Sequence, residues 1–414
     1  EILRCLVGSE MCIRDRYLQS PEYRILVKKL TEASFSERPS DKIGKTVAKI
    51  LYGEISPYSA TRLERFAACA FAHFLQYGLK VTERAEYEFR AMDMGNVMHM
   101  ALEKFAAEVR KEGLDWAELT EEERNRIIDS CLDQVSADYG NTILKSSARN
   151  EYMIERTRRI LRRTVWALQE QLKHGAFRPE GFEVRFQGGR IDRVDIMEEP
   201  ENNRVYVKVI DYKTGNTSFD LLALYHGLQL QLMVYLDGAL QVEKRKYPDR
   251  EIVPAGVFYY NVKDPMIQEK IHADMESINE QMLKKMKMNG LVQADDNMST
   301  KIDSTMASIP VSLNRDGSFS KRSSVASRKQ FDALGAYVRR KICDIRESIL
   351  DGNAAVEPYE LGKKNACTYC PYLTVCGFDR KIPGYEFHRL SSIEEDALWK
   401  KIMKGEEENG SEMD

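Results

Sequence analysis

Apolar residues recur at intervals of three and four along much of this chain, which is the pattern of helices that bury one face. The first clear example starts at Ser59, or at Thr61 with Glu64 at capping-box spacing, and Gly78 can end it. The same pattern predicts helices over residues 59–78, 94–111 and 120–135, over a stretch ending near 173, and over 219–240 and 328–350.

Between residues 181 and 261 the pattern changes to short apolar runs broken by turn residues, which indicates strands. One strand carries Asp192 and the next carries Asp211, and the polar turn EEPENNR with Pro200 joins them. Strands are also expected over residues 181–187 and 254–261. The order helix, three strands, helix, strand predicts an α/β fold, a mixed sheet with helices on both sides.

Charge is balanced over the chain of 414 residues, with 62 Lys and Arg against 65 Asp and Glu. Any nucleic-acid footprint must therefore be local. Five arginines lie within residues 156–163, and they form either a solvated helix face or a phosphate-tracking face. No apolar run could span a membrane and no secretory signal is evident, so we expect a soluble cytoplasmic protein without membrane contact.

The two ends and one internal segment are expected to lie outside this pattern. Residues 1–16 resemble a non-native scar read from a sequencing adapter, so we expect a fragment whose N-terminal portion is missing. Gly44-Lys45-Thr46 does not form a phosphate-binding loop, because Pro39 stands where glycine is required. Residues 262–326 are interpreted as an insertion without assignable chemistry, and the acidic end 405–414 as disordered.

Two acids and a lysine carry the chemistry that the strands predict. Residues two apart on a strand share a face, so Asp211 and Lys213 emerge side by side. With Asp192 from the neighbouring strand, they suggest a hard divalent metal beside a cationic partner, which is chemistry for cleaving a phosphodiester. An ion-paired strand without a metal is the simpler alternative. Asp195 points to the opposite face and shares no such support.

Other polar residues are placed where they can support this set. Gln231 and Tyr235 lie four residues apart on one helix face. His99 follows a helix start, where it is either a hydrogen-bonded structural histidine or a ligand. Glu183 is either a further ligand or a salt-bridged surface carboxylate.

Cysteines near the C-terminus form the pattern C-x2-C-x5-C at Cys367, Cys370 and Cys376. Three thiols this close indicate a metal centre, and the absence of a second Cys or His pair at short spacing disfavours zinc. An iron–sulfur cluster needs a fourth thiolate, for which the candidates are Cys69, Cys131 and Cys343. Taken alone, each of these three is more simply a core residue, and Cys5 and Cys12 fall within the scar.

The ordered set Gly95-x3-His99, Gly189-Arg190-Ile191-Asp192, Asp211-Tyr212-Lys213 and Gln231-x3-Tyr235 resembles the RecB-like branch of the PD-(D/E)XK nucleases. With YSATRLERFAACAFAHFLQYGL and the terminal cysteines, residues 56–380 resemble the C-terminal region of the AddB family of helicase–nuclease subunits. The resemblance implies a restriction-endonuclease-like sheet with helical insertions. It also implies that residues 17–50 are a remnant of a helicase-like domain, 51–390 the nuclease domain and 391–414 a tail.

The resemblance further implies a [4Fe–4S] cluster on Cys69, Cys367, Cys370 and Cys376, which would clasp the two ends of the nuclease region together. Ala70 departs from the proline that the family commonly has after the first of these cysteines. The implied partners are a single-stranded DNA end and an AddA-type helicase–nuclease subunit in a heterodimer.

The activity implied is Mg²⁺-dependent exonuclease action during the processing of double-strand DNA breaks for recombinational repair. Asp192, Asp211 and His99 would bind Mg²⁺, and Lys213 would hold or activate water. Gln231, Tyr235 and Glu183 would support them. A stand-alone Cas4-type iron–sulfur exonuclease and a non-catalytic DNA-binding module remain alternatives.

Overall fold

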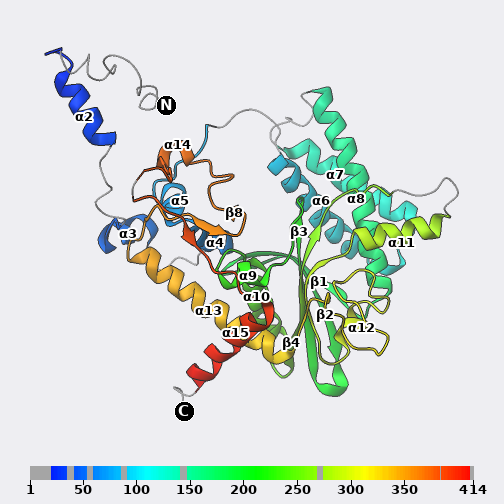
Figure 1. Cartoon of the computed structure of the whole chain (residues 1–414). Coiled ribbons are helices and arrows are strands. Elements are labelled where there is room, and N and C mark those ends of the chain that lie inside the picture. The colour runs from blue at the N-terminus through cyan, green and yellow to red at the C-terminus, as the bar shows by residue number, and fades with distance from the viewer. Residues whose placement is uncertain are drawn as a thin grey trace.

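The computed structural model describes residues 20–34, 42–53, 59–84, 91–139, 147–267, 274–382 and 384–410. Within these ranges a mixed sheet of six strands lies between two layers of helices (Figure 1). The α/β class and the helices on both faces are confirmed. The expected scar at 1–16, with Cys5 and Cys12, lies outside the described residues, as do 411–414.

The sheet follows chain order from one edge to the other. Its strands are β1 (Arg178–Phe186), β2 (Gly189–Glu199), β3 (Arg204–Lys213), β4 (Glu251–Asn261), β5 (Asn289–Gln293) and β6 (Val325–Ala326). The first three are antiparallel, β3 and β4 are parallel, β4 and β5 are antiparallel, and β5 and β6 are parallel. Side chains alternate between the faces, so Val207 and Val209 of β3 pack into one core and Tyr206 and Ile210 into the other.

One face is covered by α6 (Ala91–Lys111), α7 (Glu121–Asp138) and α8 (Ala148–Lys173), which carry the first core. The predicted helix ends at Lys111 and Lys173 are confirmed. Thr120 and Glu123 form the capping box of α7, in which each side chain accepts from the other's backbone N–H.

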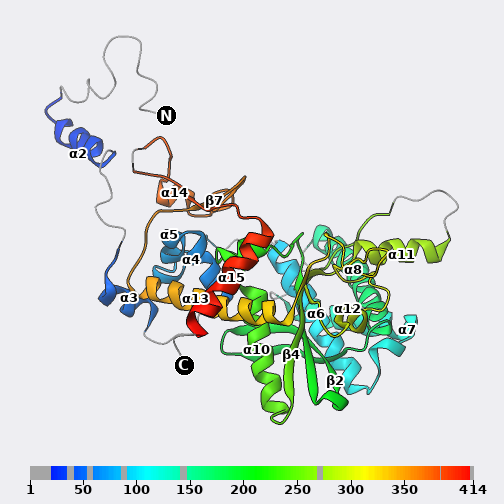
Figure 2. The same cartoon turned by 60° about the horizontal axis from the view of Figure 1, so that its bottom comes forward.

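The other face is covered by α3 (Lys45–Tyr52), α4 (Ala60–Ala68), α10 (Gln231–Lys246), α13 (Arg328–Leu350) and α15 (Glu395–Gly410) (Figure 2). Gly44 directly precedes α3 as its N-cap residue. In α15, Leu398, Trp399 and Ile402 are buried in this core. The helix continues to Gly410, so the expectation of a disordered acidic end is wrong up to that residue.

The predicted helix over 59–78 is interrupted at Cys69. Ser59 caps α4, whereas the alternative capping box of Thr61 with Glu64 does not form. Cys69 is extended at φ −168° and ψ 115°, and the chain restarts as α5 (Ala70–His73) and a π-helical turn (Phe74–Gly78). Ala70 is thus the first residue of a helix, a position that proline tolerates.

The predicted helix over 219–240 is also two helices, α9 (Leu221–Tyr225) and α10. Gly227, at φ 80°, lies between them in a left-handed conformation that favours glycine and ends the helical path. Because of this break, α10 begins as a separate helix at Gln231.

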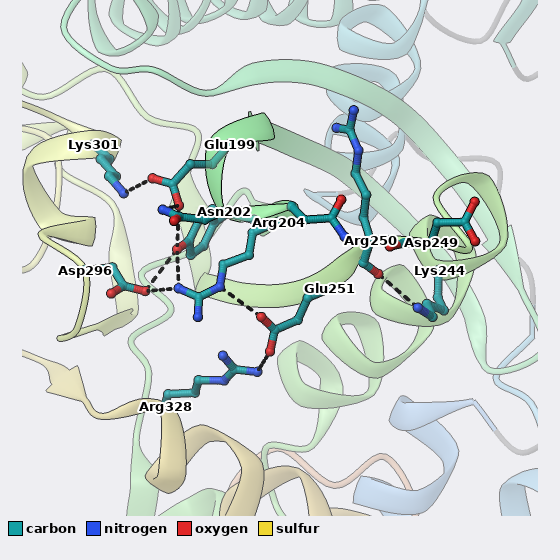
Figure 3. Close-up of polar contacts among 12 residues, drawn as sticks. Glu199, Asn202, Arg204, Lys244, Asp249, Arg250, Glu251, Asp296, Lys301 and Arg328 are labelled. Atoms are coloured by element: carbon teal, nitrogen blue, oxygen red, sulfur yellow. Dashed lines mark hydrogen bonds and ion pairs between the residues drawn. The ribbon is translucent and has the colours of Figure 1, made fainter.

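The insertion at 262–326 contributes α11 (Met275–Lys285), β5, α12 (Met298–Ile302) and β6. Ion pairs join it and α13 to the starts of β3 and β4 (Figure 3). Arg204 contacts Glu251 at 2.9 Å and Asp296 at 3.3 Å, and Lys301 contacts Glu199 at 2.8 Å. The insertion therefore completes the far edge of the sheet.

The remaining elements are α2 (Arg24–Ser34), two 3-10 turns (Trp116–Glu118 and Pro200–Asn202), α14 (Leu373–Cys376) and the small sheet β7 (Tyr359–Leu361), β8 (Lys364–Asn365) and β9 (His388–Arg389). Among the described helices, none combines the length and the apolarity that crossing a membrane requires.

The sheet face toward α6–α8 buries an ion triad. Asp195 is fully buried and pairs with Arg193 at 2.6 Å and with Lys208 at 2.9 Å. The Arg193 guanidinium also lies 5.3 Å from the Trp116 ring. Asp195 therefore points away from the Asp192 face, as predicted, and its charge is balanced by neighbours within the core.

Candidate active site

The two aspartates of the predicted site meet across neighbouring strands. Arg193 of β2 pairs with Ile210 of β3, so continuing this antiparallel register by one residue places Asp192 opposite Asp211. The backbone N–H of Tyr212 donates to Asp192 Oδ2 over 2.8 Å, which fixes the carboxylate at the end of the paired region. Asp211 is almost fully buried and Asp192 nearly so. Strand pairing therefore sets the separation of the two acids.

Lys213 joins Asp211 to the start of α10. Its Nζ lies 2.6 Å from Asp211 Oδ2 and donates to Gln231 Oε1 over 2.7 Å. The Gln231 amide in turn donates to the Tyr235 hydroxyl over 2.9 Å. These four predicted residues form one continuous polar chain, because Gln231 and Tyr235 share a face of α10.

His99 reaches the two strands from α6. Its Nδ1 lies 3.3 Å from Asp192 Oδ2. Gly95, one turn earlier, permits the close approach of the helix, since a Cβ there would lie 3.3 Å from Thr214 Oγ1. Burial disfavours the imidazolium, but the hydrogen bond and charge of Asp192 outweigh it, so the pKa of His99 is raised.

Glu183 enters from β1. The pairs on either side of it, Phe182 with Arg193 and Val184 with Ile191, place it opposite Asp192. Its backbone lies at φ 50°, a left-handed conformation that costs a non-glycine residue about 1 kcal/mol or more. The carboxylate forms an ion pair with Arg190, in agreement with the interpretation of Glu183 as a salt-bridged residue. However, its side chain is mostly buried and belongs to the site.

These residues fit a divalent cation. Among the described residues, His99, Glu183 and Asp192 offer ligand atoms that all lie within 4.8 Å of one another. Asp211 Oδ2 and Glu183 Oε2 are buried, and their ion-pair partners are Lys213 and Arg190 respectively. A bound cation would add to this compensation of their charge, and hard cations prefer carboxylate oxygens as ligands.

Burial and the neighbouring Asp192 raise the pKa values of Asp211 and Glu183. Burial, followed by the charge of Asp192, raises the pKa of Asp211 to about 6 against the opposing effect of Lys213. The same two causes raise the pKa of Glu183 to about 7. Both carboxyls are therefore partly protonated near neutral pH when no cation compensates their charge.

Glu64 is a residue of the site that the sequence analysis missed. Its Oε1 accepts from the backbone N–H groups of Leu230, over 2.7 Å, and Gln231, over 2.9 Å. It thereby caps α10 from α4, which lies 166 positions away in sequence from Leu230. Burial raises its pKa to about 7, although these hydrogen bonds oppose the shift. The false capping box with Thr61 concealed this role.

Four cysteines line a second, separate cavity: Cys69, Cys367, Cys370 and Cys376. Cys69 occupies the break between α4 and α5, where burial raises the pKa of its thiol although the N–H groups of Ala72 and Phe71 oppose the shift. Burial, and then the three other thiols, raise the pKa of Cys367 to about 11. Four thiols that face one cavity are a donor set for a soft metal or an iron–sulfur cluster.

The two other candidate cysteines lie elsewhere. Cys131 is buried in the core between α6 and α7, as predicted. Cys343 is exposed on α13, so the expectation that it packs in the core is wrong. Its position on α13 places it on a solvent-facing side of that helix.

The arginine-rich face of α8 is largely paired with acids. Arg158 contacts Asp133 at 2.7 Å, Arg162 contacts Asp129, and Arg163 contacts Asp264 at 3.5 Å. These pairs support the interpretation of a helix surface over that of a phosphate-tracking face.

Comparisons with known proteins agree with this geometry. A family model described as the PD-(D/E)XK nuclease superfamily matches residues 57–377. Three relatives are named as subunits of an ATP-dependent helicase/deoxyribonuclease. The chain is 40% identical to that of Lachnoclostridium phytofermentans over 93% of its own length. It is 35% identical to those of Alkaliphilus metalliredigens and Thermoanaerobacter sp. strain X514 over 95% and 91%.

The matched part is only a section of each relative. The chain spans 35%, 36% and 34% of their respective lengths, or about a third.

The affinity of the site for divalent cations should decrease as the pH is lowered below neutrality. The pKa values of about 7 for Glu183 and about 6 for Asp211 mean that protons compete with the cation as the pH falls below neutrality. Below its pKa, each of these carboxyls should lower the cation affinity about tenfold for each unit by which the pH falls. Above both pKa values the affinity should no longer depend on pH. Calorimetric titration with Mg²⁺ and Mn²⁺ checks this. Asp211→Asn should remove the lower step, and a pH-independent affinity would contradict the assignment.

Glu64→Ala should leave the Leu230 and Gln231 N–H groups without an acceptor. Loss of such a cap is expected to lower the free energy of unfolding by about 1 kcal/mol. Hydrogen exchange should accelerate at these two amides. Glu64→Gln keeps an acceptor oxygen and is the matched control, with a smaller effect on both measurements. Unchanged exchange in Glu64→Ala would show that the cap does not hold the start of α10.

Proposed function

Because this chain belongs to the PD-(D/E)XK nuclease superfamily, we propose that it is the Mg²⁺-dependent DNA exonuclease region of a helicase–nuclease subunit. The observation that carries the proposal is the polar chain from Asp211 through Lys213 to Gln231, beside the group of His99, Glu183 and Asp192. This arrangement combines the ligands that a hard cation needs with a fixed ammonium group. An ion-paired strand without a metal would need only Asp211 and Lys213, and would leave the presence of His99, Glu183 and Gln231 unexplained.

In this proposal Asp192 and Asp211 hold Mg²⁺, with His99 completing or orienting the ligand set and Glu183 adding to it. When bound, Mg²⁺ polarises a phosphoryl oxygen and lowers the pKa of a bound water. The ion pair with Arg190 orients the Glu183 carboxylate, and the Tyr212 N–H orients that of Asp192.

Lys213 has the position to hold or activate the attacking water and to offset negative charge as the phosphodiester is attacked. Its Nζ has two acceptors, Asp211 and Gln231, and it lies 5.4 Å from the Tyr259 ring. The hydrogen bond from Gln231 to Tyr235 fixes the orientation of the amide, so its oxygen faces the lysine. Gln231 and Tyr235 are therefore positioning residues in this proposal.

We further infer that Cys69, Cys367, Cys370 and Cys376 hold a [4Fe–4S] cluster. They line one cavity, yet their sulfurs do not form a group within 4.8 Å among the described residues. Four sulfurs around a tetrahedral zinc would lie about 3.8 Å apart, given Zn–S distances of about 2.3 Å. The wider spacing favours a polynuclear cluster, whose thiolates attach to different irons.

The surroundings of the cavity support a structural role for this cluster. The Phe378 N–H donates to Cys376 Sγ over 3.3 Å, which stabilises a thiolate. Tyr372 packs with Ala72 and Leu75 and donates its hydroxyl hydrogen to the Val81 carbonyl over 3.0 Å. The cluster would thus fasten the C-terminal segment to α4 and α5, and a redox role is not required.

The names of the relatives support a helicase–nuclease setting, and the family resemblance supplies its finer features. We propose that the region acts on a single-stranded DNA end, together with an AddA-type helicase–nuclease subunit in a heterodimer, during the processing of double-strand breaks for recombinational repair. Identity of 40% to a helicase/deoxyribonuclease subunit over 93% of the chain favours this over a stand-alone Cas4-type nuclease. The complete acid and lysine set disfavours a non-catalytic DNA-binding module.

Asp211→Asn and Lys213→Ala should each lower Mg²⁺-dependent strand degradation by the complete helicase–nuclease complex by about 100-fold or more. These substitutions remove a cation ligand or the ammonium group while keeping the strand pairing. Each DNA strand is end-labelled separately, because the partner subunit can carry its own nuclease. Asp249→Ala, in an exposed turn, is the control. Undiminished degradation of both strands would refute the nuclease assignment, provided that ATP hydrolysis confirms assembly.

Cys370→Ala should abolish the content of iron and inorganic sulfide and lower the temperature of unfolding. The remaining thiols cannot complete the ligand set, and the C-terminal segment loses its attachment. Cys343→Ala removes an exposed thiol outside the cavity and should change neither quantity. Full iron content in Cys370→Ala, or zinc in the unsubstituted protein purified without oxygen, would contradict the cluster.

A further inference from the structure

A groove beside the candidate active site is rimmed by arginines. It is lined by the end of β1, α10 and α13 and has a volume of about 480 Å³. α10 packs against both other elements, and both views place it next to α13 (Figures 1 and 2). Arg185, Arg245, Arg339 and Arg346 line it, and Asp237 is the one acidic residue in its lining. A local excess of positive charge on a chain of formal net charge −3 indicates an anionic ligand.

Two of these arginines have no partner that neutralises them. Arg185 and Arg245 are exposed and take part in no salt bridge or side-chain hydrogen bond with the described part of the chain. Arg339 pairs with Asp237 at 2.9 Å but keeps 59% of its side chain exposed. This differs from α8, where neighbouring acids pair with Arg158, Arg162 and Arg163.

The floor of the groove is apolar. Phe186, Val234 and Val338 contribute to it, together with Met233 and Ile342. Cationic side chains over an apolar floor suit single-stranded nucleic acid, whose phosphates are anionic and whose unpaired bases bury apolar surface. Duplex DNA offers its phosphates but keeps its bases stacked inside the helix.

Three elements carry residues of the groove directly next in sequence to residues at the candidate active site. Leu63 in its floor precedes Glu64 on α4, and Val234 precedes Tyr235 on α10. Gly188 adjoins the start of β2, where a Cβ on Gly189 would lie 3.6 Å from the Tyr235 ring. The groove therefore adjoins the site at Tyr235, because the Phe186 ring of the groove packs edge-to-face against the Tyr235 ring.

We propose that this groove binds single-stranded DNA next to the scissile phosphate, with Arg185 and Arg245 contacting its phosphates. The proposal rests on the proposed nuclease function and assigns the path of its substrate.

The test compares two double variants in the complete helicase–nuclease complex. Arg185→Glu with Arg245→Glu alters the groove, and Arg156→Glu with Arg159→Glu makes the same change of charge at two exposed arginines of α8. The groove variant should raise KM for single-stranded DNA cleavage about tenfold with kcat within about twofold, since the catalytic residues are untouched. The slope of log KM against log salt should fall by about 1.4, because each phosphate that an arginine no longer neutralises accounts for about 0.7.

Crosslinking provides a second measurement. Oligonucleotides that carry 5-iodouracil, bound to the Asp211→Asn complex, should crosslink to peptides containing residues 185–188 or 241–245. Equal effects of the two double variants, or crosslinks that avoid the groove, would overturn the proposal while leaving the nuclease function intact. If the groove variant instead assembled poorly with its partner subunit but kept its KM, the proposal would be wrong and the groove would bind an acidic protein surface. Undiminished cleavage in Asp211→Asn would instead refute the nuclease function itself.

Discussion

Electrostatic repulsion among Asp192, Asp211 and Glu183 is the constraint on which the rest of the site depends. Carboxylate oxygens of Glu183 and Asp192 lie within 4.8 Å of each other, and two unit charges at that distance repel by about 3.5 kcal/mol at an effective dielectric constant of about 20. Strand pairing holds them together nonetheless, because Asp192 lies opposite both other acids in the register. The raised pKa values of Asp211 and Glu183 record the cost. Lys213 and Arg190 compensate part of it.

The part of the site that local geometry determines could be predicted from the sequence. Residues two apart on a strand share one face, as do residues four apart on a helix. The Asp211–Lys213 and Gln231–Tyr235 pairs therefore needed only a correct assignment of secondary structure. Their meeting through the hydrogen bond of Lys213 to Gln231 follows from the parallel crossover between β3 and β4. The placement of His99 came from the family resemblance, and its physical basis is the small Gly95.

Features that depend on contacts between distant segments could not be predicted. Glu64 faces α10 only because α4 packs across its N-terminus, and the nearby Thr61 offered a local but false explanation of the same carboxylate. Cys69 stands within an unbroken apolar stripe, so the periodicity concealed the break that turns its thiol toward the C-terminal cysteines. β5 and β6 are too short for a pattern to emerge, since the pairing of β5 with β4 and of β6 with β5 gives them their conformation.

The two faces of β2 separate charges that stabilise the fold from charges that are available for chemistry. Asp195 is buried among Arg193 and Lys208, and both partners are close enough to neutralise it within the core. Three residues earlier, Asp192 shares its site with two other acids. In the part of the chain that the structure describes, these three carboxylates form ion pairs with one lysine, Lys213, and one arginine, Arg190, and His99 lies beside Asp192. An ion triad closed within a core has no further capacity for a ligand, whereas a buried set whose acids outnumber their lysine and arginine partners gains from a cation. The unequal balance of charge, rather than the presence of acids, distinguishes the candidate active site from its neighbour on the same strand.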